Sequence, residues 1–318
     1  MSSSLLRECG AEVLGTWLLV FVGTATGAAS VTTGMQVGIW QVAVVWGFLV
    51  ALSTFLTMHI SGAHLNPAVT IALAWSREKT GFPVHKVLPY IAAQVFGAML
   101  SGVCLLSIYG NAIARFEKLH SITRGEANST LSAMIFCDYF PNPQLVHSGV
   151  LEQEDVSSFG ALVVEAVGTM ILMLLVRSLT DETNHARPSA KQAPFFIGFT
   201  VSSLVGAIAP LSQAGFNPAR DFGPRLVVAM AGWSSIGIPG PQNGFWVYIV
   251  GPIIGALIGG HLFDVVVQPA YVATTAEQEE SKAKLLDDDE LQHPKARMGA
   301  YGSTLSYQVL PGSVQDDA

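Results

Sequence analysis

The stretch at 62–70, GAHLNPAVT, has a counterpart at 214–222, AGFNPARDF, so the tripeptide Asn-Pro-Ala occurs twice in the chain. Asn is a favourable N-cap, and Pro suits the first position of a helix because its missing N–H would have no partner there. Each tripeptide therefore predicts the beginning of a helix. Asn-Pro-Ala by itself is also common in ordinary turns, so the surroundings of the two copies have to decide the fold.

Those surroundings are poor in charge. The 318 residues are 50% hydrophobic and only 12% charged, with a mean hydropathy of +0.46. A soluble domain carries about 25% charged residues, so the composition indicates a polytopic membrane protein. The net charge of -7 owes much to the acidic C-terminal part, and no basic patch points to nucleic acid. The three cysteines have neither metal nor redox spacing, so no metal and no cofactor is expected.

The apolar stretches predict six spans and two shorter helices. Residues 13–76 contain no Asp, Glu, Lys or Arg. This uncharged segment is too long for one span of about 20 residues. Helices near 67–76 and 218–230 are too short to cross a bilayer and are candidates for re-entrant segments, which occur at membrane depth only where protein buries them or they line an aqueous cavity. The spans are expected near 11–30, 40–60, 87–109, 159–178, 193–209 and 245–267.

The two halves of the chain repeat each other. AEVLGT at 11–16 resembles VEAVGT at 164–169, and Glu12 precedes Asn66 by about the distance that separates Glu165 from Asn217. Each half then has a Glu-bearing helix, a second helix, a short helix at Asn-Pro-Ala and a third helix. Because three full spans per half is an odd number, the halves must lie inverted in the membrane. Inverted repeats with matching interrupted segments point to a site at the midplane.

Basic residues predict the orientation. Arg77, Lys79 and Lys86 follow the first short helix, and further basic residues lie between the fourth and fifth spans. Cytoplasmic connections carry an excess of Lys and Arg, so both termini are expected in the cytoplasm and the long segment 110–158 outside. That segment contains Asn128 in an Asn-Ser-Thr glycosylation pattern, although such tripeptides also occur by chance.

The predicted organisation is a short cytoplasmic N-terminus at 1–10, a membrane domain at 11–267 with repeat halves 11–109 and 159–267, and a polar, disordered cytoplasmic tail at 268–318. The tail contains Tyr307-Gln-Val-Leu, which has the form of a short sorting signal.

In an inverted pair the two short helices begin near the same point. Their N-termini each carry roughly half a positive charge, so a narrow pore between them would disfavour cations, including a proton. If the side-chain amides of the two Asn residues also face the pore, a water held by both donors points its hydrogens away and interrupts a proton wire. The alternative is that the motifs are two ordinary helix caps. The motif residues are Asn66, Pro67, Ala68, Asn217, Pro218 and Ala219.

Charged residues within the membrane segments are expected to be functional or structurally paired. Arg220 lies three residues after Asn217, and its five donors suit a constriction that binds hydroxyl groups and repels cations. A helix-end Arg that extends to the interface is the alternative. Asp221 could pair with Arg225, four residues on. Glu12 and Glu165 are expected to accept hydrogen bonds from the backbone of the re-entrant loops, with a proton relay as the alternative.

These residues resemble the major intrinsic protein family, the aquaporins and glycerol facilitators. SGAHLNPAVT and NPARDFGPR are highly specific in combination, and the resemblance extends over about 8–267. It implies an all-α membrane bundle of six transmembrane helices with two re-entrant half-helices, commonly a homotetramer with one pore per subunit. Asp221 and Arg225 resemble the glycerol-conducting branch.

The resemblance also implies a selectivity filter. Its four positions fall on Trp46, Val205, Ala214 and Arg220. Glycerol facilitators are expected to have Gly and Phe where this chain has Val205 and Ala214. Trp, Val, Ala and Arg are instead similar to the filter of one group of nodulin-like intrinsic proteins. Ala214 in place of an aromatic ring should widen the filter, while His64 is expected to line the pore through its backbone carbonyl.

The resulting hypothesis is a passive channel in a lipid bilayer, that of the plasma membrane, with an internal membrane as the alternative. It would pass water and small uncharged solutes, foremost glycerol and also urea, ammonia or undissociated metalloid acids. Two alternatives remain: an ion- or proton-coupled transporter, which shares inverted repeats and broken helices, and a structural membrane protein with an incidental pore. An enzyme is not expected, because no nucleophile–base pair is evident.

Overall fold

The computed structural model describes residues 2–36 and 38–292 of the chain. The described residues divide into two units, one ending at Pro269 and the other beginning at Ala270. Tyr307 and the rest of the predicted sorting signal lie outside the described residues.

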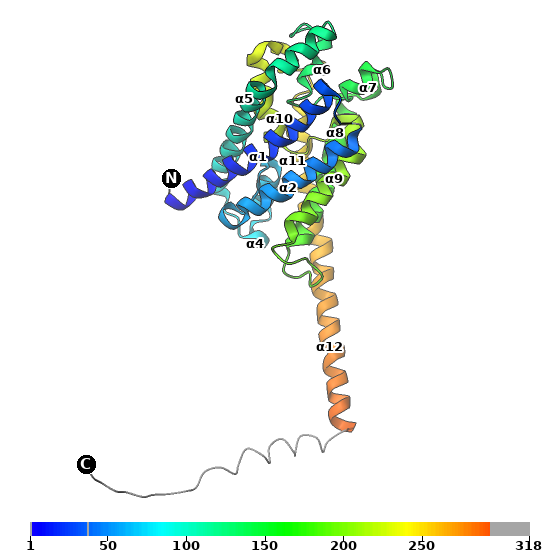
Figure 1. Ribbon diagram of the computed structural model, residues 1–318. Helices are drawn as coiled ribbons and strands as arrows, with labels where there is room; N and C mark the ends of the chain where they lie inside the picture. Colours follow the sequence, from blue (N-terminus) through cyan, green and yellow to red (C-terminus); the bar gives the residue numbers. More distant parts are fainter. Residues whose placement is uncertain (1, 37, 293–318) are drawn as a thin grey trace, which may run out of the picture. The chain divides into compact units, whose positions relative to one another are not determined.

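The first unit is a bundle of helices, and the described residues contain no β-strand (Figure 1). Its long helices are α1 (Ser3–Thr33), α2 (Ile39–Ser61), α5 (Val87–Leu119), α8 (Ser158–Thr180), α9 (Ala193–Ser212) and α11 (Val247–Leu262). The half-helices predicted at the two motifs are α3 (Pro67–Trp75) and α10 (Pro218–Val228). Short helices in the connections are α4 (Arg77–Thr80), α6 (Thr130–Ala133) and α7 (Pro143–His147), and π-helical turns follow α10 (Ala229–Trp233) and α11 (Phe263–Val267).

Six helical segments in the described part of the chain are long and apolar enough to cross a membrane. Each contains or coincides with one of the six predicted spans, and the two half-helices are 9 and 11 residues long. An all-α membrane bundle with six spans and two re-entrant half-helices is therefore confirmed. Many large apolar side chains on these helices are exposed, among them Phe55, Leu88 and Ile108, as expected for helices that face lipid.

The packing of the helices follows the sequence repeat. In the first half α1 packs against α2 and α5, and in the second half α8 packs against α9 and α11. The half-helices are exchanged, because α3 packs against α11 and α10 packs against α5. Helices α2 and α9 hold equivalent places in the two halves and contact each other. The two halves therefore share one interior rather than forming two separate domains.

Close contact between α2 and α9 depends on two glycines. A Cβ atom on Gly47 would lie 2.5 Å from the carbonyl oxygen of Gly198, and a Cβ atom on Gly198 would collide with the carbonyl oxygen of Gly47. Small residues let membrane helices approach at the level of the backbone, where van der Waals contact is greatest. At these two glycines the repeats are therefore close enough for their backbones to touch.

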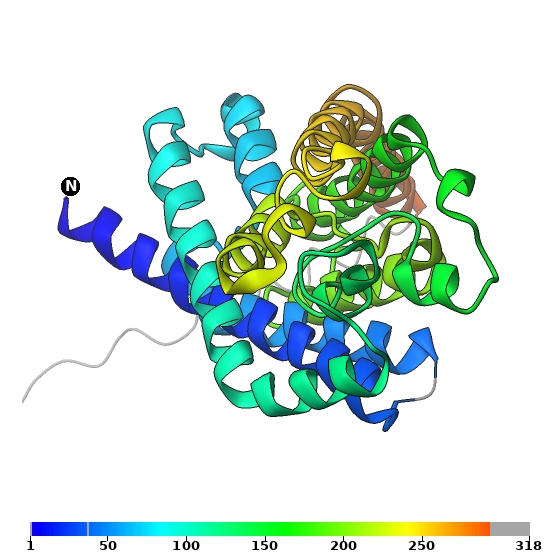
Figure 2. The same ribbon diagram turned by 90° about the horizontal axis from the view of Figure 1, so that it is seen from above.

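The helices extend beyond several predicted boundaries. Helix α1 begins at Ser3 rather than at 11, and the Ser2 hydroxyl caps it by accepting the Leu5 N–H. Helix α5 continues to Leu119, ten residues past the predicted end of its span. The last turns of α5 contain good helix formers and bury Ile113 and Phe116, so the helix persists after the sequence has become polar. The connection to α8 is therefore loop 120–157. When the molecule is viewed from above, the first part of this loop lies over the middle of the bundle, and its later, green part extends to the rim (Figure 2).

The expectation of a disordered tail from 268 is wrong for its first part. Helix α12 spans Gln268–Gln292. After Pro269 this stretch has no Gly or Pro and is rich in Ala, Glu, Lys, Leu and Gln, which have high helix propensity. Low hydropathy excludes a packed core there, but it does not exclude an exposed helix. Residues 293–318 lie outside the described part of the chain.

Candidate pore and selectivity filter

A cavity of about 290 Å³ runs through the interior that the two halves share. Both motif asparagines, Asn66 and Asn217, lie in its wall. Apolar side chains from α2, α3, α8 and α9 form most of the remaining wall, including Val50, Val69, Leu172 and Val201. Polar groups are thus confined to a few points along an otherwise apolar passage, as in sites that bind small molecules weakly and selectively.

Both half-helices begin as their sequence predicts. The Asn66 side-chain oxygen accepts the Ala68 N–H at 2.8 Å, and Pro67 occupies the first helical position. The Asn217 oxygen accepts the N–H groups of Ala219 and Arg220, at 3.0 and 3.2 Å. Each Asn therefore caps its own helix through its oxygen, which leaves the amide NH2 group available for another partner.

The amide groups bind the opposite loop. Asn66 Nδ2 donates to the Phe216 carbonyl at 2.8 Å, and Asn217 Nδ2 donates to the Leu65 carbonyl at 2.7 Å. These two hydrogen bonds join the repeats at the point where both half-helices start. An amide NH2 has two hydrogens, so this exchange uses one of each pair. The second hydrogen of each amide can serve a molecule in the cavity that both residues line.

Each re-entrant loop is held by the buried Glu of its own repeat. Glu12 accepts hydrogen bonds from the Ser61 hydroxyl and from the N–H groups of His64 and Leu65, at 2.6 to 3.0 Å. Glu165 accepts the equivalent bonds from Ser212, Gly215 and Phe216, at 2.6 to 3.0 Å. Both carboxylates are fully buried. They orient the backbone of the loops, and neither of them lines the cavity.

The same hydrogen bonds stabilise an unusual backbone. Ala63 and Leu65 in the first loop have φ values of +52° and +51°, and their counterparts Ala214 and Phe216 have +61° and +54°. Non-glycine residues adopt this left-handed conformation rarely, and they persist in it where the surroundings fix them. These bends interrupt the helical path of each loop, and the Leu65 and Phe216 carbonyls accept the Asn amides of the opposite repeat instead of helix hydrogen bonds.

A second, smaller cavity of about 70 Å³ meets the first. Its wall includes Gly27, Met134, Ile135 and Gln144, from α1 and loop 120–157. Four residues line both cavities and therefore mark the junction between them: Trp46, Val205, Gln213 and Arg220. Three of the four residues assigned to the filter by resemblance therefore lie at the junction, while Ala214 lines only the larger cavity.

Arg220 is held in place on three sides. Its guanidinium carbon lies 4.7 Å from the centroid of the Trp46 ring. Nη1 donates to the Phe136 carbonyl at 3.2 Å, and Nη2 forms an ion pair with Asp138 Oδ1 at 3.0 Å. Arg220 is 7% exposed, so it does not extend to a polar interface. Among the described residues, these contacts leave further N–H groups of the guanidinium without a partner, and since Arg220 lines both cavities, they can donate to a permeating hydroxyl group.

Asp221 and Arg225 lie behind the filter and form the predicted pair. The Arg225 guanidinium binds both carboxylate oxygens of Asp221, at 2.8 and 2.9 Å, and it also donates to the carbonyls of Gly237 and Asp138. Both side chains are almost completely buried. A bidentate pair of this kind fixes the geometry of α10 and of the adjoining loop.

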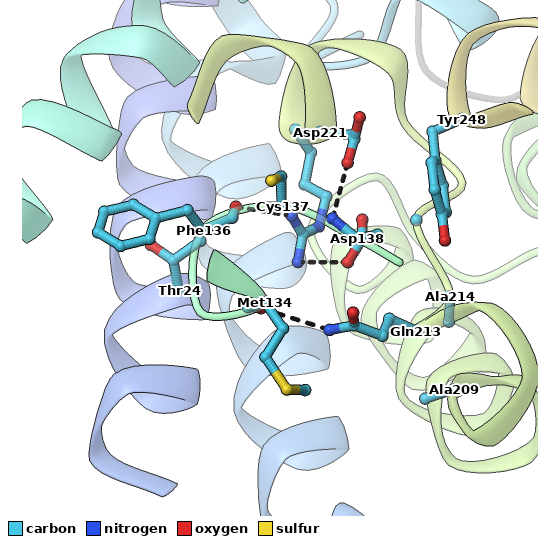
Figure 3. Close-up of polar contacts among 12 residues, drawn as sticks. Thr24, Met134, Phe136, Cys137, Asp138, Ala209, Gln213, Ala214, Asp221 and Tyr248 are labelled. Carbon is cyan, nitrogen blue, oxygen red and sulfur yellow. Dashed lines mark hydrogen bonds and ion pairs between the residues drawn. The ribbon is translucent and has the colours of Figure 1, made fainter. Parts of the chain in front are cut away.

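Sequence reasoning missed the contribution of loop 120–157. Phe136 and Asp138 contact the filter arginine, and the Gln213 side chain donates to the Met134 carbonyl at 3.3 Å (Figure 3). The Gln213 side chain also accepts the Tyr139 N–H at 2.9 Å. The available signal was Asp138 itself, the only charged residue between Glu126 and Glu152. An isolated charge in an otherwise apolar stretch indicates a buried partner.

Burial affects the ionisation of two neighbouring groups in loop 120–157. It raises the pKa of the Cys137 thiol to about 12, so this cysteine stays protonated and unreactive. Burial also raises the pKa of Asp138 above its usual range, while the guanidinium of Arg220 opposes that rise. The charge of Asp138 therefore depends on its cationic neighbours.

Two other predicted residues lie away from the junction. His64 lines the larger cavity, where its Nδ1 lies 3.1 Å from the Thr70 hydroxyl and its ring packs against Phe82 and Tyr90. Asn128 is exposed, and its Nδ2 donates to the Ser121 carbonyl at 3.1 Å. Within the described residues, no group of three or more His, Cys, Asp or Glu side chains could hold a metal ion.

Comparison with known proteins agrees with this geometry. Residues 1–263 match the family described as Major intrinsic protein. The chain is 40% identical over 265 residues to the glycerol uptake facilitator protein of Haemophilus influenzae, covering 83% of this chain and 94% of that protein. It is 38% identical over 285 residues to the propanediol uptake facilitator of Citrobacter freundii, covering 89% of this chain and all of that protein.

A solved structure is similar as well. The aquaglyceroporin from Plasmodium falciparum superimposes with a TM-score of 0.70 at 25% sequence identity, over 84% of this chain and 98% of that one. The resemblance deduced from the two Asn-Pro-Ala motifs is thereby confirmed over almost the whole first unit. The chain belongs to the major intrinsic protein family and is a multi-pass membrane channel, passive and without enzymatic activity.

Proposed function

We propose that this channel conducts glycerol together with water and other small uncharged solutes. The observation that supports it most directly is the composition of the junction between the two cavities. There Arg220 lines the passage together with Trp46, Val205 and Gln213, and the methyl group of Ala214 lies nearby in the wall of the larger cavity. The relatives named as glycerol and propanediol uptake facilitators agree with a polyol as the solute.

A polyol has a hydroxyl edge and a C–H edge, and the filter offers a partner to each. The hydroxyl edge can accept hydrogen bonds from the guanidinium of Arg220. The C–H edge can slide along the indole face of Trp46 and the side chain of Val205, where apolar contact replaces lost water. A solute without hydroxyl or amide groups would leave the buried donors of Arg220 unpaired, which is costly.

Exclusion of protons would depend on the paired half-helix starts. The N-termini of α3 and α10 lie where Asn66 and Asn217 bind the opposite loops, at 2.8 and 2.7 Å. Two partial positive charges and two remaining amide hydrogens then act on a water at that point, which opposes both cation entry and a continuous proton wire.

The assembly and placement of the channel are part of the proposal. We infer a homotetramer in the plasma membrane with both termini in the cytoplasm, as the basic connections indicate. Loop 120–157 then faces outward, where Asn128 would be accessible for glycosylation. We also infer the organisation that the sequence pattern predicts, with an N-terminus at 1–10, a channel domain at 11–267 and a tail from 268.

Stopped-flow swelling of proteoliposomes tests the function. Vesicles containing the protein should swell rapidly in glycerol and more slowly in urea. They should not swell in a non-permeant sugar. Glycerol flux should be the same with and without proton or sodium gradients. Flux that follows either gradient would indicate a coupled transporter, and swelling no faster than that of protein-free vesicles would indicate a structural protein with an incidental pore.

A further inference from the structure

Loop 120–157 places a fully buried carboxylate against the filter arginine. Asp138 is 0% exposed, and its Oδ1 lies 3.0 Å from Nη2 of Arg220 (Figure 3). Among the described residues, neither carboxylate oxygen receives a hydrogen bond of good geometry. The ion pair with Arg220 is therefore the main compensation for a buried carboxylate, which would otherwise be very unfavourable.

The neighbouring charges leave Asp138 as the counter-ion of Arg220. Arg225 already binds Asp221 through both carboxylate oxygens. Glu165 is engaged by the Ser212 hydroxyl and two backbone N–H groups. Two arginines and two aspartates thus form a balanced cluster behind the filter, in which Arg220 and Asp138 are the remaining pair.

The backbone of Asp138 is fixed by the same cluster. Its N–H donates to Asp221 Oδ1 at 2.7 Å, and its carbonyl accepts a hydrogen bond from Arg225 Nη2. The ring of Tyr248 stands opposite Asp138 in Figure 3, and both residues line a small third cavity of about 10 Å³ with Arg225. The carboxylate is therefore held in position by rigid neighbours rather than by a mobile loop.

The second re-entrant loop makes room for this carboxylate. A Cβ atom on Gly215 would lie 3.1 Å from Asp138 Oδ2 and 3.2 Å from Glu165 Oε2. The equivalent position in the first loop is His64. The two repeats therefore differ at the point where Asp138 enters, and only the repeat that carries Arg220 has the space for it.

Asp138 does not line either of the two cavities that meet at the filter, whereas Arg220 lines both. Any effect of Asp138 on a permeating solute must therefore pass through the guanidinium. Nη1 and Nη2 are both directed to loop 120–157, one to the Phe136 carbonyl and one to Asp138. Of these two anchors, the carboxylate is the stronger because it carries charge.

We propose that Asp138 is a positioning residue that determines the selectivity of the filter. It holds the Arg220 guanidinium against loop 120–157, which keeps the passage open to polyols, and it balances the charge, so that small anions find no binding site in the filter. This inference rests on the proposed conduction of glycerol. It adds that the filter arginine acts as half of a neutral pair.

Removal of the carboxylate should have two consequences. The Arg220 side chain would be free to turn into the passage, which should obstruct glycerol more than water because glycerol is larger. Its uncompensated charge should also bind a planar anion, since the guanidinium fork matches planar oxyanions. Nitrate is a suitable probe of this second effect.

The test is a double-mutant cycle in proteoliposomes. Glycerol and water permeabilities are measured for the wild type, Asp138→Asn, Arg220→Ala and the double variant, with and without nitrate. Because burial raises the pKa of Asp138, all assays are run at mildly alkaline pH. In the presence of Arg220, Asp138→Asn should lower the glycerol-to-water ratio by about threefold or more and make glycerol flux sensitive to nitrate, since residues that act as one unit show strong coupling.

In the Arg220→Ala background the same substitution should change neither the ratio nor the nitrate sensitivity. Equal effects of Asp138→Asn in both backgrounds, or none with Arg220 present, would overturn the proposal. Wild-type swelling in glycerol tests the proposed function separately, since it does not depend on the variants.

Three further variants guard against trivial outcomes. Asp138→Glu keeps the charge and should stay insensitive to nitrate. Asp138→Ser repeats the test with a smaller neutral side chain if the amide is not accommodated. Glu126→Gln removes a charge from an exposed position in the same loop and should leave both measurements at their wild-type values.

Discussion

Ala214 contributes only a methyl group to the wall of the pore. It lies next to Gln213 and three residues before Asn217, has a φ of +61°, and lines the larger cavity. Ala214→Phe should place a ring beside the donors of Arg220 and lower the glycerol-to-water permeability ratio by about tenfold, the scale on which pocket size alters discrimination. Stopped-flow measurements in glycerol and in an impermeant osmolyte give the glycerol permeability and the water permeability of each variant.

The matched control at this position is Ala214→Gly. Glycine accepts the left-handed backbone without strain and removes the methyl group, so the ratio should stay the same or rise. A glycerol-to-water ratio that is unchanged in Ala214→Phe would show that Ala214 does not form part of the filter.

Glu165 supports the second re-entrant loop through three accepted hydrogen bonds. In Glu165→Gln, the NH2 group that replaces one oxygen would face either the Phe216 N–H or the Gly215 N–H, so one buried donor loses its acceptor. An unsatisfied buried donor costs about 1–3 kcal/mol. We expect a lower midpoint of thermal unfolding in detergent and reduced permeability to both water and glycerol.

Glu126→Gln is again the control, because that side chain is exposed and substitutions at exposed sites usually change stability little. Equal unfolding midpoints for the two variants would mean that the carboxylate of Glu165 does not stabilise the loop.

The sequence predicted the roles of single residues best where the same residue occurs at equivalent positions in both repeats. Glu12 and Glu165 were expected to accept backbone hydrogen bonds from the re-entrant loops, and the structure has those bonds in both halves. Asp138 has no counterpart in the other repeat, and its partner Arg220 is 82 residues away. A single residue in a connecting segment gives no periodic pattern, so only the folded chain could reveal its contact.

Among the elements, the crossing of α2 and α9 is the most sensitive to side-chain size. The backbone of Gly198 touches the backbone of Gly47. Gly198→Val should separate the two helices, because neither carbonyl can move away without breaking its own helix. We expect little folded protein after extraction in detergent, as judged by a monodisperse peak in size-exclusion chromatography.

Gly206 lies in the same helix and provides the matched comparison. A Cβ atom there would meet nothing within 4 Å, so Gly206→Val introduces the same side chain without a collision. This variant should elute and unfold like the wild type. Equally good recovery of Gly198→Val would mean that the two repeats do not need backbone contact between α2 and α9.

Element boundaries were predicted well only where hydropathy and helix propensity end together. The predicted half-helix at 67–76 and the observed Pro67–Trp75 agree because an Asn-Pro start is a local signal. Helix α5 and the tail were misjudged for one reason. In both segments the apolar residues end while helix-forming residues continue. Hydropathy alone predicts where a helix leaves the membrane, and it does not predict where that helix ends.

The molecule as a whole is an inverted repeat with one functional asymmetry. The hydrogen bonds of the two Glu residues, the two caps and the exchange between the two Asn amides are all duplicated. Among the described residues, the cluster of Arg220, Arg225, Asp221 and Asp138 has no counterpart in the first repeat, because it joins three residues of the second repeat to Asp138 of loop 120–157. The duplicated contacts hold the two half-helix starts together, and the unique cluster positions Arg220, to which we assign the proposed selectivity.

The second unit should be dispensable for conduction. All residues that line the two cavities at the filter lie within 1–269, as do the pairs that support the filter arginine. Removing residues 276–318 keeps the first two turns of α12, so that the end of the bundle is not disturbed. The shortened channel should have the wild-type glycerol-to-water ratio and the same midpoint of thermal unfolding.

The measurement is swelling of proteoliposomes with equal amounts of reconstituted protein, so that differences in cellular amount do not enter. A changed ratio at equal protein content would show that the C-terminal unit takes part in permeation, whereas a change confined to the amount of protein at the cell surface would assign it to targeting.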